Sequence, residues 1–229
     1  MDQAADDGCG WRLSAGSITR YWRTACHCKT NSTHSRRISR AASRRTTHRP
    51  EFTRSWSAPP PSFTLKDQDG KEVSSAELLR RGPLVITFYR GVWCPYCNIE
   101  LKAINEVLLQ IEGYGASVVA ISPQTAVNSR KSVRDNKLGF PVLSDTNGEV
   151  GAAFGLRFAL PDYLVDLYKA LKNDLPAFNA DPAWTLPMPA RYVIGQDGIV
   201  LYSEVNPDYT HRPDPVDMLP VLERANANA

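Results

Sequence analysis

Two cysteines separated by two residues are the side chains of this sequence best suited to chemistry. Cys94 and Cys97 stand in "VWCPYCN", directly after an apolar run and directly before a stretch with helical periodicity. The thiolate is the reactive form of cysteine, and the first turn of a helix offers unpaired N–H groups and a partial positive charge that stabilise it. Cys94 is therefore expected to attack, and Cys97, one turn later on the same side, to resolve by closing a disulfide.

Two other interpretations of the cysteine pair stay open. A zinc site would need a second pair of Cys or His ligands, but residues 59–229 hold no further Cys and one His, His211. Two small buried hydrophobic side chains are the other alternative. The neighbouring Trp93 and Pro95 argue against it, because they shape the loop rather than fill a core. We expect no metal and no cofactor.

The charge of the chain is divided between two regions. Residues 1–58 carry 11 Lys and Arg against 4 Asp and Glu, whereas residues 59–229 carry 16 against 20. The basic region is rich in Ser, Thr and Arg, so we expect a disordered extension that cannot bury enough apolar surface to fold. Its cysteines, Cys9, Cys26 and Cys28, lack a matching second metal half-site and are interpreted as incidental.

The extension also bears on location and partners. No apolar run is long enough for a membrane span or a secretory signal, so we expect no membrane partner and a cytoplasmic protein. An Arg- and Ser-rich, acid-poor segment also fits an organelle transit peptide, although the acidic opening "MDQAADD" argues against it. A start of translation nearer "APPPSF" is a third reading. A nucleic-acid partner is disfavoured, because charge runs are more often only solvated.

The elements that must position the cysteines can be read along residues 59–225. A β-hairpin turns at Asp69-Gly70, and a short helix follows, opened by a capping box of Ser74 and Glu77. The run "PLVITFY", 83–89, is typical of a strand buried on both faces. One helix beginning at Pro95 is predicted from an apolar stripe at three- and four-residue steps: Cys97, Leu101, Ile104, Leu108 and Ile111.

Further strands are predicted at 117–122 and 140–145, with a polar helix between them that ends at Gly139 and a short helix at 149–156. The segment 156–188 is interpreted as an insertion that carries an amphipathic helix at 161–171. A hairpin at 190–205 and a closing helix complete the pattern. Strands and helices in this order predict an α/β fold, a central mixed β-sheet flanked by helices, behind an N-terminal β-hairpin.

Residues 59–225 resemble the thioredoxin superfamily, and within it the peroxiredoxin-like branch of alkyl hydroperoxide reductases and thiol-specific antioxidants. The stretches that carry the resemblance are "FTLKDQDGKEV", "VITFYRGVWCPYCNIEL", "VVAISPQ" with "FPVLSD", and "LPMPARYVIGQDGIVLYSEVNPDYTHRPDP". It implies a thioredoxin-like fold in one domain, with Cys94 as the peroxidatic and Cys97 as the resolving cysteine. The side chains that it places around them are Tyr89, Arg90, Gly91, Trp93, Pro95 and Pro189.

The chemistry implied by the resemblance is reduction of hydrogen peroxide or an organic hydroperoxide. The peroxidatic thiolate becomes a sulfenic acid, which condenses with the resolving thiol to a disulfide. Thioredoxin, or a glutaredoxin- or glutathione-type reductant, then restores the thiols. A homodimer stays open as a further partner.

Two departures from the branch bear on this reading. The branch has Pro-x-x-x-Thr/Ser-x-x-Cys, but Gly91 stands three residues before Cys94, so the hydroxyl that orients the peroxide is missing. Its usual Arg position, three residues before the aromatic of the later strand, holds Pro189, and Arg191 is displaced by two. Arg90 either supplies the cation instead or is a surface side chain at a strand end. Pro189 matches the thioredoxin pattern, for which we predict a cis Met188–Pro189 bond beside the cysteines.

Two competing functions follow. Thiol–disulfide exchange on protein or small-molecule disulfides is the alternative enzyme activity, favoured by the missing hydroxyl and the displaced arginine. A non-enzymatic binding protein that uses the basic residues 1–58 is the third class. Peroxide consumption with a thioredoxin donor separates the first two, and deletion of residues 1–58 separates the third.

Overall fold

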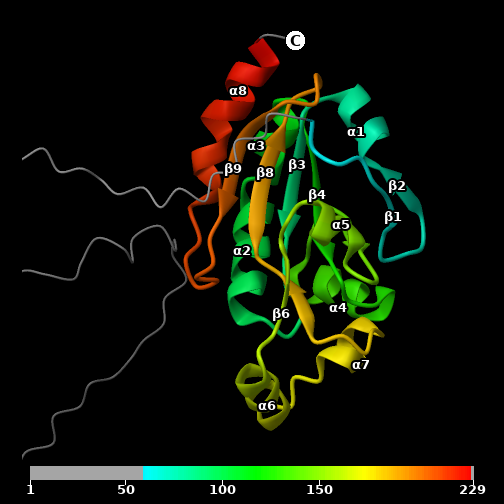
Figure 1. Cartoon of the computed structure of the whole chain (residues 1–229). Helices are drawn as coiled ribbons and strands as arrows, with labels where there is room; N and C mark the ends of the chain where they lie inside the picture. The colour runs from blue at the N-terminus through cyan, green and yellow to red at the C-terminus, as the bar shows by residue number, and fades with distance from the viewer. Residues whose placement is uncertain (1–58, 228–229) are drawn as a thin grey trace, which may run out of the picture. The chain divides into compact units, whose positions relative to one another are not determined.

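Residues 59–227, which the computed structural model describes, form a sheet with helices on both faces, as the alternating pattern predicts (Figure 1). The strands are β1 (Thr64–Lys66), β2 (Glu72–Ser74), β3 (Leu84–Phe88), β4 (Ser117–Ser122), β5 (Val142–Ser144), β6 (Arg157–Ala159), β7 (Thr185–Pro187), β8 (Ala190–Ile194) and β9 (Val200–Val205). The helices are α1 (Ser75–Arg81), α2 (Pro95–Glu106), α3 (Leu108–Gly113), α4 (Ala126–Asn136), α5 (Glu149–Ala153), α6 (Asp162–Ala170), α7 (Leu175–Asn179), the 3₁₀ turn η2 (Pro215–Met218) and α8 (Leu219–Ala227).

The main sheet has seven strands in the order β2-β1-β5-β4-β3-β8-β9. Its centre, β3, β4 and β5, is parallel, and β8, β9 and the hairpin of β1 and β2 join it antiparallel. This mixed sheet with helices on its faces confirms the predicted fold class. Crossover helices place the carboxyl ends of the parallel strands at one edge, so the loop that follows β3 leaves from the middle of that edge.

The cysteine loop therefore starts from the most enclosed strand of the molecule. All five residues of β3 are buried, with β4 on one side and β8 on the other. The antiparallel register pairs Phe88 with Ala190 and Thr87 with Arg191. A strand covered on both faces has little freedom to shift, because a slip of one residue would turn every side chain to the opposite face.

Three apolar clusters hold the fold together. One fills the face covered by α2, α3 and α8 and includes both cysteines, and a second fills the face covered by α1 and α5, around Phe88 and Phe154. A smaller third cluster lies under the insertion, where Leu160, Leu175 and Leu186 are joined by residues of α6. Trp93 packs against both the first and the third cluster, so the insertion is attached to the cysteine loop.

Three local expectations were wrong. The predicted single helix is two, because the Val107 N–H bonds to the carbonyl of Ile104, three residues back, in a tight turn between α2 and α3. Ser74 precedes α1 but makes no capping hydrogen bond; the hydroxyl of Ser75 instead binds the backbone of Phe63. The polar helix α4 ends before Gly139, with Lys137 in the left-handed conformation.

The insertion is more ordered than its sequence predicts. The amphipathic helix is present as α6, but β6 and β7 also pair as a small antiparallel sheet, and α7 lies beside it (Figure 1). Each strand has three residues, too few for an alternation to be read, and Pro187 belongs to one of them. A proline within a run ordinarily argues against a strand.

The expectations for residues 1–58, including disorder, targeting and the cysteines found there, lie outside the described residues. Among residues 59–227, no helix combines the length and the apolar character needed to cross a membrane. The same residues contain no group of three metal-ligating side chains close enough to hold an ion.

Candidate active site

Cys94 occupies the N-cap position of α2. Its backbone is extended (φ −88°, ψ 110°), Pro95 takes the first helical position, and the Cys97 N–H donates to the Cys94 sulfur at 3.4 Å. Both thiols are free and fully buried. The helix start therefore gives Cys94 one direct N–H donor in addition to the partial positive charge of the helix.

Arg90, two residues after the end of β3, points its guanidinium at the same sulfur. Its Nη2 lies 3.2 Å from the Cys94 Sγ, and its Nη1 donates to the Tyr168 hydroxyl of α6 at 3.0 Å. The Cζ atom stands 3.7 Å from the centre of the Tyr209 ring and 5.2 Å from that of Trp93. Only 5% of Arg90 is exposed, so it is the cation of this site and not a surface side chain.

The two thiols have opposite electrostatic environments. The hydrogen bond from the Cys97 thiol, reinforced by the charge of Arg90 and against the effect of burial, lowers the pKa of Cys94 from 9.0 to about 6. Burial, together with the hydrogen bond to Cys94 and its negative charge, raises the pKa of Cys97 well above the ordinary range. At neutral pH the pair is thus one thiolate and one thiol, the arrangement that a nucleophile and a resolving group need.

This difference predicts the pH dependence of alkylation. Reaction of Cys94 with iodoacetamide should rise through a midpoint near pH 6, because only the thiolate reacts and it is fully formed above that pH. Cys97→Ala should move the midpoint to higher pH, because it removes the largest stabilising hydrogen bond. The measurement is the modified fraction of each cysteine against pH by peptide mass spectrometry. A midpoint near that of a free thiol in the wild-type protein would contradict the assignment.

Tyr89 anchors the cysteine loop through hydrogen bonds of its hydroxyl. Its buried hydroxyl accepts a hydrogen bond from Gln124 at 2.5 Å and donates to Ser132 at 3.3 Å, and burial raises its pKa above the ordinary value. The Oε1 of Gln124 in turn accepts from the Val92 N–H at 2.9 Å. Tyr89 therefore connects the cysteine loop to α4 through a side-chain network, and it is not itself an acid or base at neutral pH.

The indole of Trp93 lies beside Gly91, where the resemblance would place a hydroxyl. Gly91 has φ +149°, and a Cβ placed there would stand 2.6 Å from the Trp93 Nε1. The indole N–H therefore lies where a side chain at position 91 would begin. It is buried and has no hydrogen-bond partner among residues 59–227, as is also true of the Arg90 Nε. Two N–H donors are thus available beside the loop.

Pro189 and Arg191 have different surroundings in the structure. Pro189 is buried directly before β8, whose first residue, Ala190, pairs with Phe88 at the end of β3, so it stands close to the start of the cysteine loop. The cis form of its peptide bond stays a prediction. Arg191 faces α2, where its Nη2 contacts the Glu100 carboxylate at 3.1 Å.

Sequence reasoning missed several residues that complete the site. They are Tyr168 and Tyr209 around Arg90, Gln124 under the loop, and Glu100 with Arg212 near Cys97. Glu100 carried a local signal, because an acidic residue three after Cys97 shares the buried stripe of the helix. The others come from distant segments and carried none.

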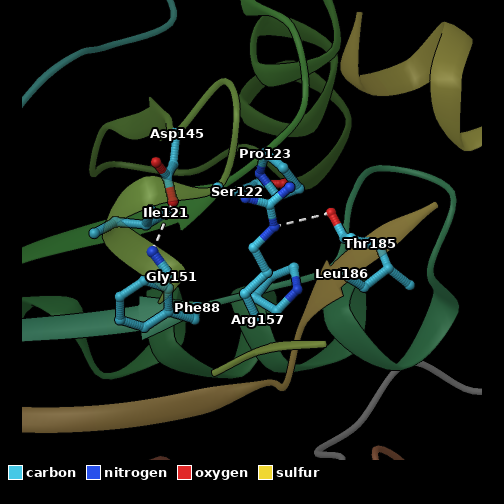
Figure 2. A pocket seen from close by; sticks show the side chains of 11 residues that line it. Phe88, Ile121, Ser122, Pro123, Asp145, Gly151, Arg157, Thr185 and Leu186 are labelled. Atoms are coloured by element: carbon cyan, nitrogen blue, oxygen red, sulfur yellow. Dashed lines mark hydrogen bonds between the residues drawn. The ribbon is translucent and has the colours of Figure 1, made fainter. Parts of the chain in front are cut away.

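A separate hollow on the other face of the sheet is not this site. It is lined by Phe88 and Ile121 of the second apolar cluster and closed by Arg157, whose Nε donates to Thr185 at 3.2 Å (Figure 2). Asp145 beside it accepts the N–H of Gly151. Neither cysteine borders the hollow, and its two charged side chains, Arg157 and Asp145, already have hydrogen-bond partners.

Comparisons with known proteins agree with this geometry. The AhpC/TSA family model matches residues 57–203. The chloroplastic peroxiredoxin Q of Oryza sativa subsp. japonica is 30% identical over 142 residues, which are 62% of this chain and 55% of that protein. The thiol-disulfide oxidoreductase ResA of Bacillus thuringiensis is 26% identical over 107 residues, 46% of this chain and 61% of that protein. The chain thus spans little more than half the length of these curated relatives.

Among solved structures, that of peroxidoxin BcpB from Mycobacterium tuberculosis superposes with a TM-score of 0.58 at 24% identity, over 73% of this chain and 95% of that one. Peroxiredoxin Q of Xanthomonas campestris gives 0.56 at 16% identity, over 72% and 91%. At such identities these structures support the fold alone. The family model covers the cysteine loop, the parallel strands β3, β4 and β5, the strand β8, and β9 except for its last two residues. On that match, this chain belongs to the AhpC/TSA family.

Proposed function

We propose that this protein is a thiol-dependent peroxidase that reduces hydrogen peroxide or small organic hydroperoxides. The observation that carries the proposal is the Cys94 sulfur, which accepts a hydrogen bond from the Cys97 N–H and lies 3.2 Å from the Arg90 guanidinium. Such an environment favours the thiolate, the form that attacks the O–O bond. Membership of the AhpC/TSA family and the peroxiredoxin Q relatives support the same reaction.

The reaction takes two steps at the pair. The Cys94 thiolate attacks one peroxide oxygen, the O–O bond breaks, and the other oxygen leaves as alkoxide or hydroxide and takes up a proton. The Cys97 thiol then loses its proton and attacks the Cys94 sulfenic acid, so that the S–S bond forms and the hydroxyl leaves as water. A thiol donor, thioredoxin or a glutaredoxin- or glutathione-type reductant, supplies the two electrons that reopen the disulfide.

Two buried N–H groups suit the peroxide itself. A buried donor without a partner costs about 1–3 kcal/mol, so such groups tend to mark a place where another molecule binds. Among the described residues, the Arg90 Nε and the Trp93 Nε1 are in this state, one beside the thiolate and one where the family hydroxyl is missing at Gly91. We assign them to the peroxide oxygens. Burial of Cys94 favours small substrates over bulky ones.

Thiol–disulfide exchange stays the second candidate. The short C-x-x-C spacing, the absence of a hydroxyl at Gly91 and the ResA relative favour it. Reduction of insulin disulfides, measured beside peroxide consumption with thioredoxin and its reductase as donor, separates the two activities. Location stays a prediction as well: the cytoplasm, or an organelle if residues 1–58 direct transport, which the chloroplastic names of the relatives favour.

One equivalent of hydrogen peroxide should convert the reduced protein to a species lighter by two hydrogen atoms. Peptide mapping should locate the new bond between Cys94 and Cys97, because the N-cap and the first turn of α2 keep these residues close. Addition of a dithiol should restore the starting mass. A persistent sulfenic acid, or a bridge from Cys94 to Cys9, Cys26, Cys28 or another chain, would move the resolving role away from Cys97.

A further inference from the structure

A second guanidinium stands beside the second cysteine. The Nη2 of Arg212 lies 3.9 Å from the Cys97 sulfur, although the two residues are 115 positions apart in the sequence. Arg212 belongs to the segment between β9 and the turn η2, and only 15% of its side chain is exposed. Each sulfur of the pair therefore contacts a different guanidinium: Cys94 that of Arg90, and Cys97 that of Arg212.

Arg212 is held in place by a buried carboxylate. Its Nε lies 2.7 Å from Oε2 of Glu100, which is one helical turn after Cys97 on α2. The Oε1 of Glu100 contacts the Arg191 Nη2 at 3.1 Å, and that same Nη2 donates to the Pro213 carbonyl at 3.0 Å. The backbone beside Arg212 is thus tied to β8, and its side chain to α2.

The charges in this cluster do not cancel while Cys97 is a thiol. Among the buried groups, two guanidinium groups face one carboxylate, which leaves one positive charge in excess; Asp208 also attracts Arg212, but from a fully exposed position where solvent screens its charge. Burying an uncompensated charge is costly, and an adjacent anion removes much of that cost. A thiolate at Cys97 would complete the cluster, just as the Cys94 thiolate already completes Arg90.

The order of ionisation follows from the same contacts. In the reduced protein, burial and the neighbouring Cys94 thiolate raise the pKa of Cys97, which stays protonated. Oxidation of Cys94 to a sulfenic acid removes that negative charge, whereas the Arg212 contact remains. The other titratable groups that act on Cys97 are Arg90, Tyr89 and Tyr168.

We propose that Arg212 is a catalytic residue of the resolving step, which stabilises the Cys97 thiolate as it attacks the Cys94 sulfenic acid. Glu100 and Arg191 are positioning residues that hold Arg212 against the sulfur. The inference rests on the proposed peroxidase function, because it concerns the second step of that reaction: the Cys97 proton goes to solvent, the Cys97 thiolate forms the S–S bond, and the hydroxyl of the sulfenic acid leaves as hydroxide, which takes up a proton from solvent to become water.

Rapid mixing with hydrogen peroxide followed by acid quench and mass spectrometry measures both steps, sulfenic acid and then disulfide, at a series of pH values. Arg212→Gln should form the sulfenic acid within about threefold of the wild-type rate, but close the disulfide about 10–100-fold more slowly at pH 7, with a midpoint moved to higher pH. Arg212→Lys should recover much of the rate. Arg80→Gln, an equal loss of charge at an exposed position of α1, should match wild type.

A variant expected to shift the midpoint in the opposite direction distinguishes the proposal from general structural damage. Glu100→Gln keeps a side-chain oxygen that can accept from the Arg212 Nε and so hold Arg212 in place, but it removes the negative charge that offsets Arg212; the midpoint of disulfide closure should therefore move to lower pH. Unchanged closure in Arg212→Gln, an equal loss in both steps, a lysine variant as slow as the glutamine variant, or shifts of the same sign in Arg212→Gln and Glu100→Gln would each overturn the inference. If the wild-type protein forms no sulfenic acid at all, the proposed function fails instead.

Discussion

Replacing Cys94 by serine should abolish peroxide consumption, with a loss of about a thousandfold or more. Serine keeps the size of the side chain, but its hydroxyl does not ionise near neutral pH, so neither the Cys97 N–H nor Arg90 has an anion to stabilise. Cys97→Ser should instead react once, at a rate close to that of wild type, and stop as a sulfenic acid that overoxidises or pairs with an added thiol. Single-turnover peroxide loss with intact mass measures both.

The two variants control each other, because both cysteines are fully buried at the start of α2, Cys94 at its N-cap and Cys97 in its first turn, and the substitutions are identical. Equal loss in Cys94→Ser and Cys97→Ser during the first turnover would mean that the pair acts only as a unit, and would favour disulfide exchange. Peroxide consumption by Cys94→Ser at the wild-type rate would show that another group is the nucleophile.

The cysteine pair could be predicted because its geometry is local. The strand, the tight loop and the start of the helix all lie within residues 83–108. Each can be predicted from the period of its apolar residues and from Pro95 at the first helical position. The N-cap position of Cys94 and the burial of Cys97 are then consequences of the helix phase. The structure has both.

The charges around the pair could not be predicted, because they arrive from distant segments. Arg212 reaches Cys97 across 115 positions, and Tyr168 reaches Arg90 across 78, from an insertion whose small sheet left no readable pattern. Only the strand order, with β8 beside β3 and the insertion packed on Trp93, brings these side chains together. Long-range packing of this kind is not encoded in any spacing.

Arg90 shows the limit in a single residue. At a strand end, an arginine either turns to solvent or turns in, and the sequence offers no means to decide. In the structure Arg90 turns inward, where its guanidinium contacts the Cys94 sulfur and the Tyr168 hydroxyl. It also lies against the rings of Tyr209 and Trp93. A buried guanidinium needs such partners, because an unpaired buried charge is costly.

Arg90→Met should slow the reaction of Cys94 with peroxide by about 10³–10⁴-fold at pH 7, through two effects that multiply. Without the guanidinium the pKa of Cys94 rises, so less of the thiol is ionised, at about tenfold per pKa unit. The buried Nε–H that we assign to the peroxide is also lost, and a donor aimed at developing negative charge contributes about 10²–10³-fold in enzymes of known mechanism. Methionine fills much of the same volume, so the fold should survive.

Measuring the first step from pH 5 to 10 separates the two effects. Part of the deficit in Arg90→Met should disappear at alkaline pH, where Cys94 ionises unaided, and the part that belongs to peroxide binding should remain. Tyr168→Phe, which removes only the acceptor of the Arg90 Nη1, should cost a few fold, and Arg80→Met on the exposed face of α1 should cost nothing. A rate for Arg90→Met within threefold of wild type at pH 7 would mean that the 3.2 Å contact with the sulfur stabilises neither the thiolate nor the transition state.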